Sequence, residues 1–338
     1  MTVPRATDRI LFIHVSRIGD TLFATPAMRA VAAALPEAHL TVLGHPGRVA
    51  VLHHLPFIQR CGAMTRRRAP WLGRLSGPVH DWALVYGFDG PLVDYALRVA
   101  HRVVAFRQRE EALNRRLFRV VDVPPFQGEH AVLQMLRLPA ALAIAPSGLR
   151  LAMALTGAEV AAARLRLALQ ATATPLVGLQ VASFPTKAYR DWPVEHFLQL
   201  CQGMISLWPA VHFVILGGGA EQARTQWLQQ QLGSRATSHA GRLTLRETAA
   251  LMSQLDLYVG VDTGPTHMMS TFDIPMVALY HCLSSSALTG PIDHPCCYSI
   301  DHPRTGQGCT AGASMAEITV DRVLATAIQA LETRGRVR

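Results

Sequence analysis

Val259-Gly260-Val261-Asp262-Thr263-Gly264-Pro265-Thr266-His267 joins an apolar strand to a Gly-Pro turn that opens a helix. The first backbone N–H groups of a helix lack partners within the helix, and they lie at the positive end of its dipole. Phosphate oxygens can therefore bind at such a turn without a dedicated side chain. The stretch predicts an anion site at the carboxyl end of a strand, where open α/β sheets bind their ligands.

A second junction of the same kind lies near the start of the chain. The apolar run of residues 10–15 leads into Ser16-Arg17-Ile18-Gly19-Asp20-Thr21, which again has the pattern of strand, glycine turn and helix. Here a carboxylate, Asp20, stands in the first helical turn, where the dipole keeps it ionised. An acid that only stabilises the helix is the alternative interpretation. We expect one junction to hold phosphate and the other to supply an acid or base.

Strand and helix patterns alternate twice along the chain. At 338 residues the chain is longer than one core usually supports, so two domains are expected. Strands are predicted at residues 9–15, 39–43, 82–86, 102–106, 176–181, 211–216, 257–261 and 276–280. This rhythm predicts an α/β fold with two Rossmann-like domains, whose parallel sheets face each other across a cleft.

The predicted helices set the domain boundaries. They lie at residues 21–35, 194–207, 219–231, 244–253 and 264–272, and the stretch 140–173, rich in Ala, Leu and Arg, is also expected to be helical. A linker is expected at 172–175. The first domain is therefore placed at residues 1–172 and the second at 173–316, with a helical tail at 317–338.

The charge favours an anionic partner. The formal net charge is +9, and the arginines gather in the first half of the chain. The clustered positions are Arg66, Arg67, Arg68, Arg74, Arg107, Arg109, Arg115, Arg116 and Arg119. A merely solubilising surface is the alternative. Nucleic acid is not predicted, because no aromatic residues alternate with the arginines. Anionic lipid or a phosphorylated glycolipid fits better.

Two further strand ends carry residues suited to a ligand. Gly217 follows the predicted strand 211–216, and a glycine turn lets the backbone approach a ligand closely. A plain tight turn is the alternative, since the G-x-G-x-x-G fingerprint is absent. The loop 183–193 contains Lys187 and Arg190, which can close over a diphosphate, although exposed loop cations are common without a function.

No apolar run approaches the roughly 20 residues that cross a bilayer, and the start of the chain has no signal-peptide core. A cytoplasmic protein is expected, so the six cysteines predict reduced thiols rather than disulfides. The alternative interpretation is a metal cluster formed by Cys296, Cys297 and Cys309, with His294 and His302 nearby. Their spacing is poor for zinc because adjacent cysteines rarely complete one tetrahedral site, so no metal is predicted.

Taken together, these segments resemble glycosyltransferase family 9, the bacterial heptosyltransferases of lipopolysaccharide core synthesis, over nearly the whole chain. The matching segments are residues 10–30 with Ser16-x-x-Gly19-Asp20 and Ala24-Thr25-Pro26, Trp192-Pro193-x-Glu195-His196-Phe197, Leu216-Gly217-Gly218, Leu245-x-Glu247-x-Ala249-Ala250-Leu251, and Asp262-x-Gly264-Pro265-x-His267. Their order and spacing are specific as a set, whereas each alone is a weak signal.

The resemblance implies a GT-B fold and an inverting transfer that needs no metal and no cofactor. It implies that the first domain binds the acceptor, with Asp20 as general base and Ser16, Arg17 and Gly19 on the acceptor side. On the donor side it implies Ser183, Thr186, Lys187, Arg190, Gly217, Asp262, Thr263, Gly264, Pro265 and His267. The tail helix is expected to pack back on the first domain.

The implied partners are a nucleotide sugar, ADP-heptose, and an anionic glycolipid or core oligosaccharide. Peripheral contact with the inner face of the inner membrane follows from such an acceptor, whereas lipid A–Kdo and a protein hydroxyl stay open as acceptors. Another nucleotide-sugar enzyme, such as an epimerase or dehydrogenase, would need a nicotinamide fingerprint that is not found. A noncatalytic scaffold that binds nucleotide sugar is the third class.

Three departures from the family pattern bear on specificity. Arg190 stands two residues before Trp-Pro, where the family commonly has Lys, and Lys187 lies three residues earlier, so both are expected to serve the phosphate. Residues 281–286 replace the family's Gly-Pro-Thr loop, which leaves nucleotide and sugar preference open. His14 replaces a basic residue, and a histidine that ends a buried strand is expected to be packed rather than catalytic.

Overall fold

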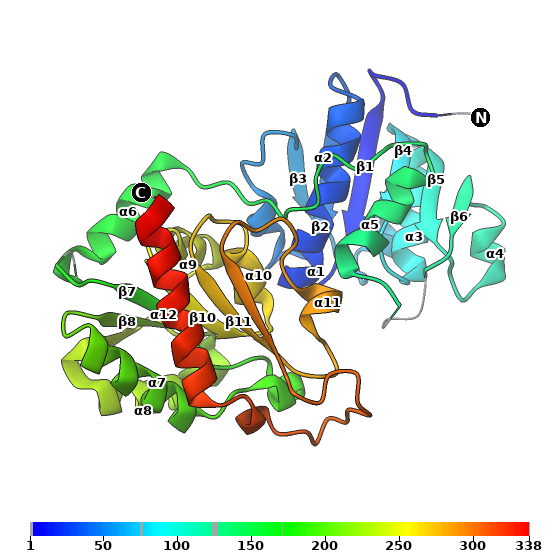
Figure 1. Cartoon of the computed structure of the whole chain (residues 1–338). Helices are drawn as coiled ribbons and strands as arrows, with labels where there is room; N and C mark the ends of the chain where they lie inside the picture. The colour runs from blue at the N-terminus through cyan, green and yellow to red at the C-terminus, as the bar shows by residue number, and fades with distance from the viewer. Residues whose placement is uncertain (1–2, 75–76, 124–127, 171, 338) are drawn as a thin grey trace. The chain divides into compact units, whose positions relative to one another are not determined.

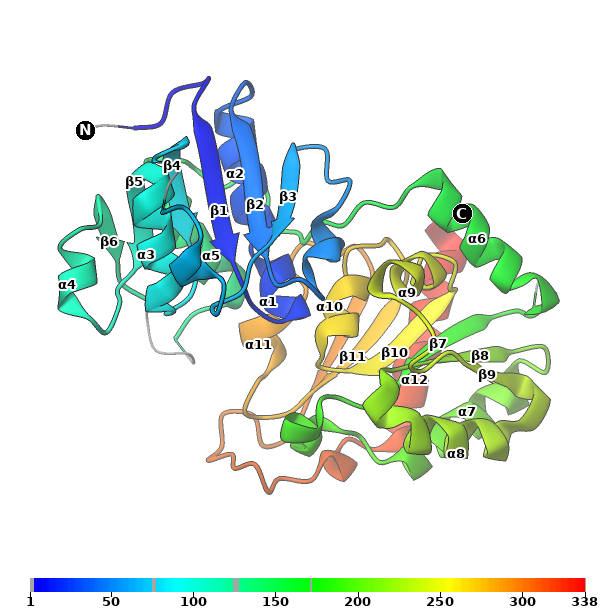
Figure 2. The same ribbon diagram turned by 180° about the vertical axis from the view of Figure 1, so that it is seen from behind.

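The computed structural model describes residues 3–74, 77–123, 128–170 and 172–337. The chain divides into two compact units, Met1–Ala154 and Leu155–Arg338, and each contains one six-stranded sheet whose strand pairs are all parallel (Figures 1 and 2). The α/β prediction is confirmed. None of the described helices is both long and apolar enough to span a bilayer.

The first unit has the strand order β3-β2-β1-β4-β5-β6. Its strands are β1 (Arg9–His14), β2 (His39–Gly44), β3 (Arg60–Ala63), β4 (His80–Val85), β5 (Ala100–Phe106) and β6 (Arg119–Val121). Its helices are α1 (Ile18–Phe23), α2 (Thr25–Ala34), α3 (Gly90–Val99), α4 (Glu111–Asn114) and α5 (Ala131–Ala140). Strand β1 is central and its residues 10–13 are fully buried, so the junction that follows it is rigidly supported.

The second unit has the strand order β12-β11-β10-β7-β8-β9. Its strands are β7 (Leu176–Gln180), β8 (His212–Leu216), β9 (Ala236–Ser238), β10 (Leu257–Val261), β11 (Met276–Tyr280) and β12 (Cys297–Asp301). Its helices are α6 (Gly157–Arg166), α7 (Val194–Leu207), α8 (Gln222–Leu232), α9 (Leu245–Met252), α10 (Gly264–Met269), α11 (Ser286–Thr289) and α12 (Val320–Val337). Strands β7 and β10 are neighbours, so their carboxyl ends share one edge of the sheet.

The domain boundary differs from the predicted one. The helix expected over 140–173 does not form as one element: α5 ends at Ala140, and Ala143 and Gly148 take positive φ angles of 61° and 81°. The segment then crosses α2, where the Ala152 N–H donates to Thr25 Oγ1 (2.9 Å). Helix α6 belongs to the second unit, because it packs on α9.

The tail helix also differs from its predicted place. Helix α12, drawn in red, lies against α7, β10, β11 and β12 (Figure 1), where Val323, Ala327 and Ala330 are fully buried in the core of the second unit. The prediction placed this helix on the first domain, whereas its described contacts lie in the core of the second unit. Gly203 of α7 is the reason for the fit, because a Cβ there would lie 2.7 Å from Leu324 Cδ2.

Candidate active site

The β1–α1 junction holds Asp20 in a defined orientation. Ser16 Oγ donates a hydrogen bond to Asp20 Oδ2 (2.6 Å), and Arg48 Nη1 donates to the Ser16 carbonyl (3.0 Å). The Thr21 hydroxyl donates to the Arg17 carbonyl (2.7 Å), which fixes the first turn of α1. Gly19 is buried, whereas Asp20 is only partly buried. One carboxylate oxygen is thus held by Ser16, and the carboxylate remains accessible.

His14 lies beneath this junction. Its ring stacks on Tyr86 with centroids 5.4 Å apart, and its Nδ1 has no hydrogen-bond partner among the described residues. Burial lowers the pKa of His14 to about 4, although the charge of Asp20 opposes the shift. At neutral pH the imidazole is therefore uncharged and packed, and it cannot form an ion pair with the carboxylate.

A pocket of about 600 Å³ opens at the carboxyl ends of β4 and β5, on the sheet edge that also carries Asp20. Arg66 and Arg109 line it, and Arg66 Nη1 lies 3.6 Å from Asp89 Oδ1. Phe88, Gln108 and Arg109 also line an adjoining pocket of about 470 Å³. The two pockets share these three residues and are together called the groove here; their exposed arginines suit an anionic ligand.

Other arginines of the predicted clusters already have partners. Arg107 pairs with Asp122, Arg116 pairs with Asp94, Arg119 donates to the Ala141 carbonyl, and Arg74 lies over the Trp71 ring. Arg109, in contrast, forms no ion pair with the described residues. Part of the positive charge in the first half of the chain therefore serves intramolecular contacts. Arg109, which lines the groove, remains available to a ligand.

The β10–α10 junction is built around a threonine. Thr266 Oγ1 donates to the Val261 carbonyl (2.5 Å) and lies 2.8 Å from the Tyr258 hydroxyl. Gly260 makes room for this tyrosine, because a Cβ there would lie 2.6 Å from the Tyr258 hydroxyl oxygen. Helix α10 then starts at Gly264, with a proline in its first turn. The Thr266 contacts thus fix the turn. The Thr266 and His267 N–H groups donate to the Thr263 carbonyl, so the N–H groups of Thr263 and Gly264 are those left without an acceptor among the described residues.

Asp262 stands at the centre of a buried charged cluster. Its side chain is 1% exposed, and Arg190 Nη1 donates to Oδ2 (2.8 Å). The Ser284 hydroxyl also donates to Oδ2, and His267 Nε2 lies 3.3 Å from Oδ1. Burial works against ionisation, yet the bond and charge of His267, with Arg190 and Ser284, hold the pKa of Asp262 below its usual value. Asp262 is thus an ionised anchor.

The loop after β7 is tied to the same sheet edge. The Ser183 N–H and hydroxyl both donate to Asp191 Oδ1 (2.7 and 2.6 Å), and Arg224 Nη1 donates to Asp191 Oδ2 (2.8 Å). The 3₁₀ segment η4 (Pro185–Arg190) carries the predicted cations. These contacts fix both ends of the loop, so Lys187 and Arg190 lie on a segment whose conformation is held in place.

The two cations of the loop differ in how they are held. Arg190 is 18% exposed and paired with Asp262, whereas Lys187 forms no ion pair with the described residues. Lys187 Nζ lies 3.5 Å from the Tyr189 hydroxyl. Burial of Tyr189 is outweighed by Arg190 and Lys187, which lower the pKa of its hydroxyl. Lys187 is therefore the cation more available to a phosphate.

Two predicted donor-side residues lie apart from the Asp262 cluster in the described contacts. Thr186 is exposed on η4. Gly217 directly follows β8, its carbonyl accepts the Gly241 N–H (3.0 Å), and the next N–H, of Gly218, donates to Glu221 Oε2 (2.5 Å). The glycine turn is thus held by its own contacts at the carboxyl end of its strand.

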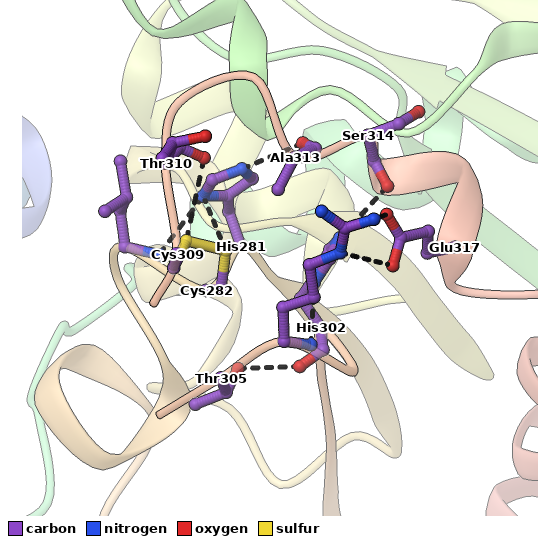
Figure 3. The surroundings of a disulfide bond; sticks show 11 residues. His281, Cys282, His302, Thr305, Cys309, Thr310, Ala313, Ser314 and Glu317 are labelled. Carbon is purple, nitrogen blue, oxygen red and sulfur yellow. Dashed lines mark hydrogen bonds and ion pairs between the residues drawn. A yellow bond between two sulfur atoms is a disulfide. The ribbon is translucent and has the colours of Figure 1, made fainter. Parts of the chain in front are cut away.

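The cysteine prediction is wrong at one pair. Cys282 and Cys309 form a disulfide with Cα atoms 5.8 Å apart (Figure 3), although reduced thiols were expected throughout. Twenty-seven positions separate the two, so no local spacing signals the pair. Cys309 therefore lies with Cys282 and His281, not with the predicted Cys296 and Cys297.

Sequence reasoning also missed partners outside the matched motifs. Two come from distant segments: Ser284 donates to Asp262, and Arg224 donates to Asp191. The third, Tyr189, lies between the two cations of the loop. The ring of His281 contacts Tyr189 with centroids 4.8 Å apart, and burial lowers the pKa of His281. One signal for Ser284 was available in the sequence. Residues 281–286 depart from the family's Gly-Pro-Thr loop, and this segment follows β11 into the site.

Solved structures of glycosyltransferases share this fold. The chain is similar to a glycosyl transferase family 9 protein from Veillonella parvula (TM-score 0.84, 17% identity, 98% of this chain and 99% of that one). It is also similar to E. coli ADP-heptose lps heptosyltransferase II (0.78, 19%, 97% and 99%) and to E. coli heptosyltransferase WaaC with ADP (0.72, 17%, 95% and 99%). The two parallel sheets are thus those of the GT-B fold. No curated protein matches the sequence.

The family follows from the sequence itself. Residues 98–302, more than half of the chain, match glycosyltransferase family 9 (heptosyltransferase). The chain belongs to this family.

Proposed function

We propose that the chain is an inverting, metal-independent glycosyltransferase that moves a heptose from ADP-heptose to an anionic glycolipid or core oligosaccharide. The observation that carries the proposal is the buried Asp262–Arg190 pair beside the opening of α10, in a chain of this family. The solved complex of WaaC with ADP supports the choice of nucleotide.

The second unit supplies the leaving-group site. A diphosphate placed at Thr263–Gly264 accepts hydrogen bonds from the N–H groups of these two residues, which have no acceptor among the described residues. Lys187 adds a positive charge as the sugar–phosphate bond breaks, and Asp262 keeps Arg190 oriented. His267 and Pro265 shape the turn. The amides and cations stabilise the negative charge that develops on the departing diphosphate.

The first unit supplies the base. Asp20 Oδ1 accepts the proton of an acceptor hydroxyl while that oxygen bonds to the anomeric carbon and the bond to the diphosphate breaks, which inverts the configuration. The Ser16 hydroxyl donates to Oδ2, which leaves Oδ1 for the proton of the acceptor. The bound substrates exclude water around Asp20, which strengthens the contact between its carboxylate and the acceptor hydroxyl.

The acceptor charge has a place in the groove of the first unit. Arg66 and Arg109 line it at the carboxyl ends of the strands that flank β1 on one side. Phosphate or carboxylate groups of a glycolipid fit these cations, and Phe88 offers an apolar wall.

A transfer assay with purified chain tests the proposal. ADP should raise the melting temperature more than GDP or UDP, and ADP-heptose should be consumed only with acceptor present. Asp20→Asn should abolish turnover while the ADP-induced shift is kept. Retained transfer in this variant would refute the base, a preference for UDP would change the donor, and nucleotide binding without any transfer would favour a noncatalytic scaffold.

The segment around η2 (Ala69–Trp71) suits the cytoplasmic surface of an anionic membrane. Trp71 is 73% exposed beside exposed Leu72, and Arg66, Arg67 and Arg68 precede it. Tryptophan prefers the lipid interface, and each arginine adds about 1 kcal/mol near an anionic surface. We expect Arg67→Gln to weaken binding to phosphatidylglycerol-containing vesicles about fivefold and Trp71→Ser to weaken it further in cosedimentation. Leu165→Ser, at another exposed position, should change nothing; equal binding by all three variants would contradict the proposal.

A further inference from the structure

His281, Cys282 and Cys309 bring three metal-binding side chains together outside the transfer site. Their ligand atoms all lie within 4.8 Å of one another, and in the described part of the chain no other group of three His, Cys, Asp or Glu side chains does so. His281 and Cys282 directly follow β11, and Cys309 comes from the segment after β12 (Figure 3). The three side chains thus lie on segments that follow the neighbouring strands β11 and β12.

The imidazole of His281 is oriented as a ligand. Its Nε2 lies 3.1 Å from the Ala313 carbonyl, so Nε2 carries the proton and donates it there. Nδ1 is then the nitrogen that can accept, and it lies 3.8 Å from Cys282 Sγ. A metal-bound histidine usually donates its other N–H to a carbonyl in this way. The Leu283 N–H, which now approaches Nδ1 at 3.1 Å, would give up that contact.

Two thiolates and one imidazole are a zinc ligand set. Zn²⁺ prefers sulfur and nitrogen donors in a tetrahedron, and three protein ligands leave a fourth position for water. His302 is close, with its ring centroid 5.6 Å from that of His281, but its ring nitrogens do not belong to the group of ligand atoms that lie within 4.8 Å of one another. The fourth ligand is therefore water.

We propose that His281, Cys282 and Cys309 bind one Zn²⁺ when the cysteines are reduced, and that the disulfide is the oxidised, metal-free form of the same site. A dithiol reductant supplies two electrons and two protons to the Cys282–Cys309 bond and becomes a disulfide itself. Zn²⁺ then binds both sulfurs and displaces their two protons to solvent.

The site borders the phosphate cluster without entering its chemistry. The His281 ring contacts Tyr189, and Ser284, two residues after Cys282, donates to Asp262. A metal at His281–Cys282 would therefore brace the segment that carries Ser284, in either the presence or absence of donor. No step of sugar transfer depends on it.

Co²⁺ titration of the intact chain tests the site. After anaerobic reduction with a dithiol and removal of the reductant, Co²⁺ should produce a thiolate-to-cobalt charge-transfer band and tetrahedral visible bands that saturate at one metal per chain. Zn²⁺ should abolish them. The same chain with its disulfide intact should give neither band, which makes the wild type its own control.

Matched variants assign the ligands. Cys282→Ser and Cys309→Ser should each weaken binding by more than about 100-fold, since even outer partners of a metal contribute 10- to 100-fold. Cys297→Ser, in β12 of the same unit, should bind like the wild type. Circular dichroism confirms that each variant is folded. Absent thiolate bands in the reduced wild type, or bands that survive Cys309→Ser, would overturn the proposal. The cobalt bands and the metal affinities of the variants do not depend on sugar transfer. The proposed transferase function can therefore be refuted while the metal site stands, and the reverse.

Discussion

At the scale of the residue, Asp262 shows how a buried charge is made tolerable. An isolated carboxylate at 1% exposure would be costly, and Arg190, Ser284 and His267 together supply its compensation. Removing the charge leaves the guanidinium largely buried beside an uncharged amide. The residue is therefore expected to matter for stability as well as for donor binding.

Asp262→Asn is expected to lower the free energy of unfolding by about 3 kcal/mol, as for other broken buried pairs. Urea denaturation followed by circular dichroism measures it. Asp122→Asn is the matched control, because Asp122 pairs with Arg107 on the surface, where both side chains are more than half exposed. The control should leave stability essentially unchanged, and equal effects of the two substitutions would contradict the argument.

His14 predicts a pH dependence of stability. Its pKa in the folded chain is about 4, below the ordinary 6.5, because it is buried. As pH falls below the ordinary value, the unfolded chain takes up this proton and the folded chain does not, so stability is lost on acidification until the folded pKa is reached. The full contribution is roughly 3 kcal/mol.

His14→Gln should therefore remove this part of the acid sensitivity. Urea denaturation at neutral pH and near pH 4.5 compares the loss of stability in the two proteins, which cancels any constant effect of the substitution. The variant should lose less than the wild type. An identical loss in both would mean that His14 takes up its proton in the folded chain as readily as in the unfolded one.

Residues adjacent in sequence were the predictable part of the site. Asp262 and His267 lie five positions apart at one junction, and Ser16 and Asp20 lie within one helical turn. Ser284 could not be placed in the cluster, because its contact depends on the pairing of β10 with β11. No local sequence pattern specifies how β10 and β11 pair, and this pairing places Ser284 beside Asp262.

At the scale of the element, strand β10 leads into the proposed anion site, and its sequence makes room for one side chain, that of Tyr258. Tyr258 is fully buried and reaches Thr266, which requires that Gly260, two residues on, has no Cβ. Gly260→Ala is expected to destabilise the fold by about 1–3 kcal/mol, since the buried ring has no space to move. Thermal or urea unfolding measures the loss.

Gly157→Ala is the control for that substitution. Gly157 begins α6, and a Cβ there would meet nothing within 4 Å, so the change should be neutral or slightly stabilising. A loss at Gly157 as large as at Gly260 would show that backbone freedom, not the space beneath Tyr258, sets the cost.

Central and edge strands differed in how far they could be predicted. The eight predicted strands all form, because apolar runs such as those of β1 and β10 are buried on both faces. The outer strands β3, β6, β9 and β12 escaped prediction. Strand β6, for example, has only three residues, all partly buried, and its two valines are too short an apolar run to mark a strand.

At the scale of the whole molecule, each unit has its own sheet and core, and the match to family 9 spans parts of both. The βαβ rhythm predicted this duplication. It could not predict which unit receives α6 and α12, since an amphipathic helix fits any apolar face of suitable size. The salt bridge between Glu159 and Arg246 and the buried Trp192 bond to the Ile318 carbonyl decided it.

Separate units predict that the donor nucleotide stabilises one part of the chain selectively. ADP at about 100 times its dissociation constant adds about 2.7 kcal/mol to a state that binds it. Hydrogen exchange read by mass spectrometry should therefore slow at residues 183–191 and 262–267, where Asp191 and Asp262 anchor the proposed phosphate loops. Residues 80–106 of the first unit should exchange at an unchanged rate, and they serve as the internal reference. Asp262→Asn should reduce the protection at both segments together, because Arg190 links them. Protection confined to the first unit would show that the nucleotide binds elsewhere than at the opening of α10.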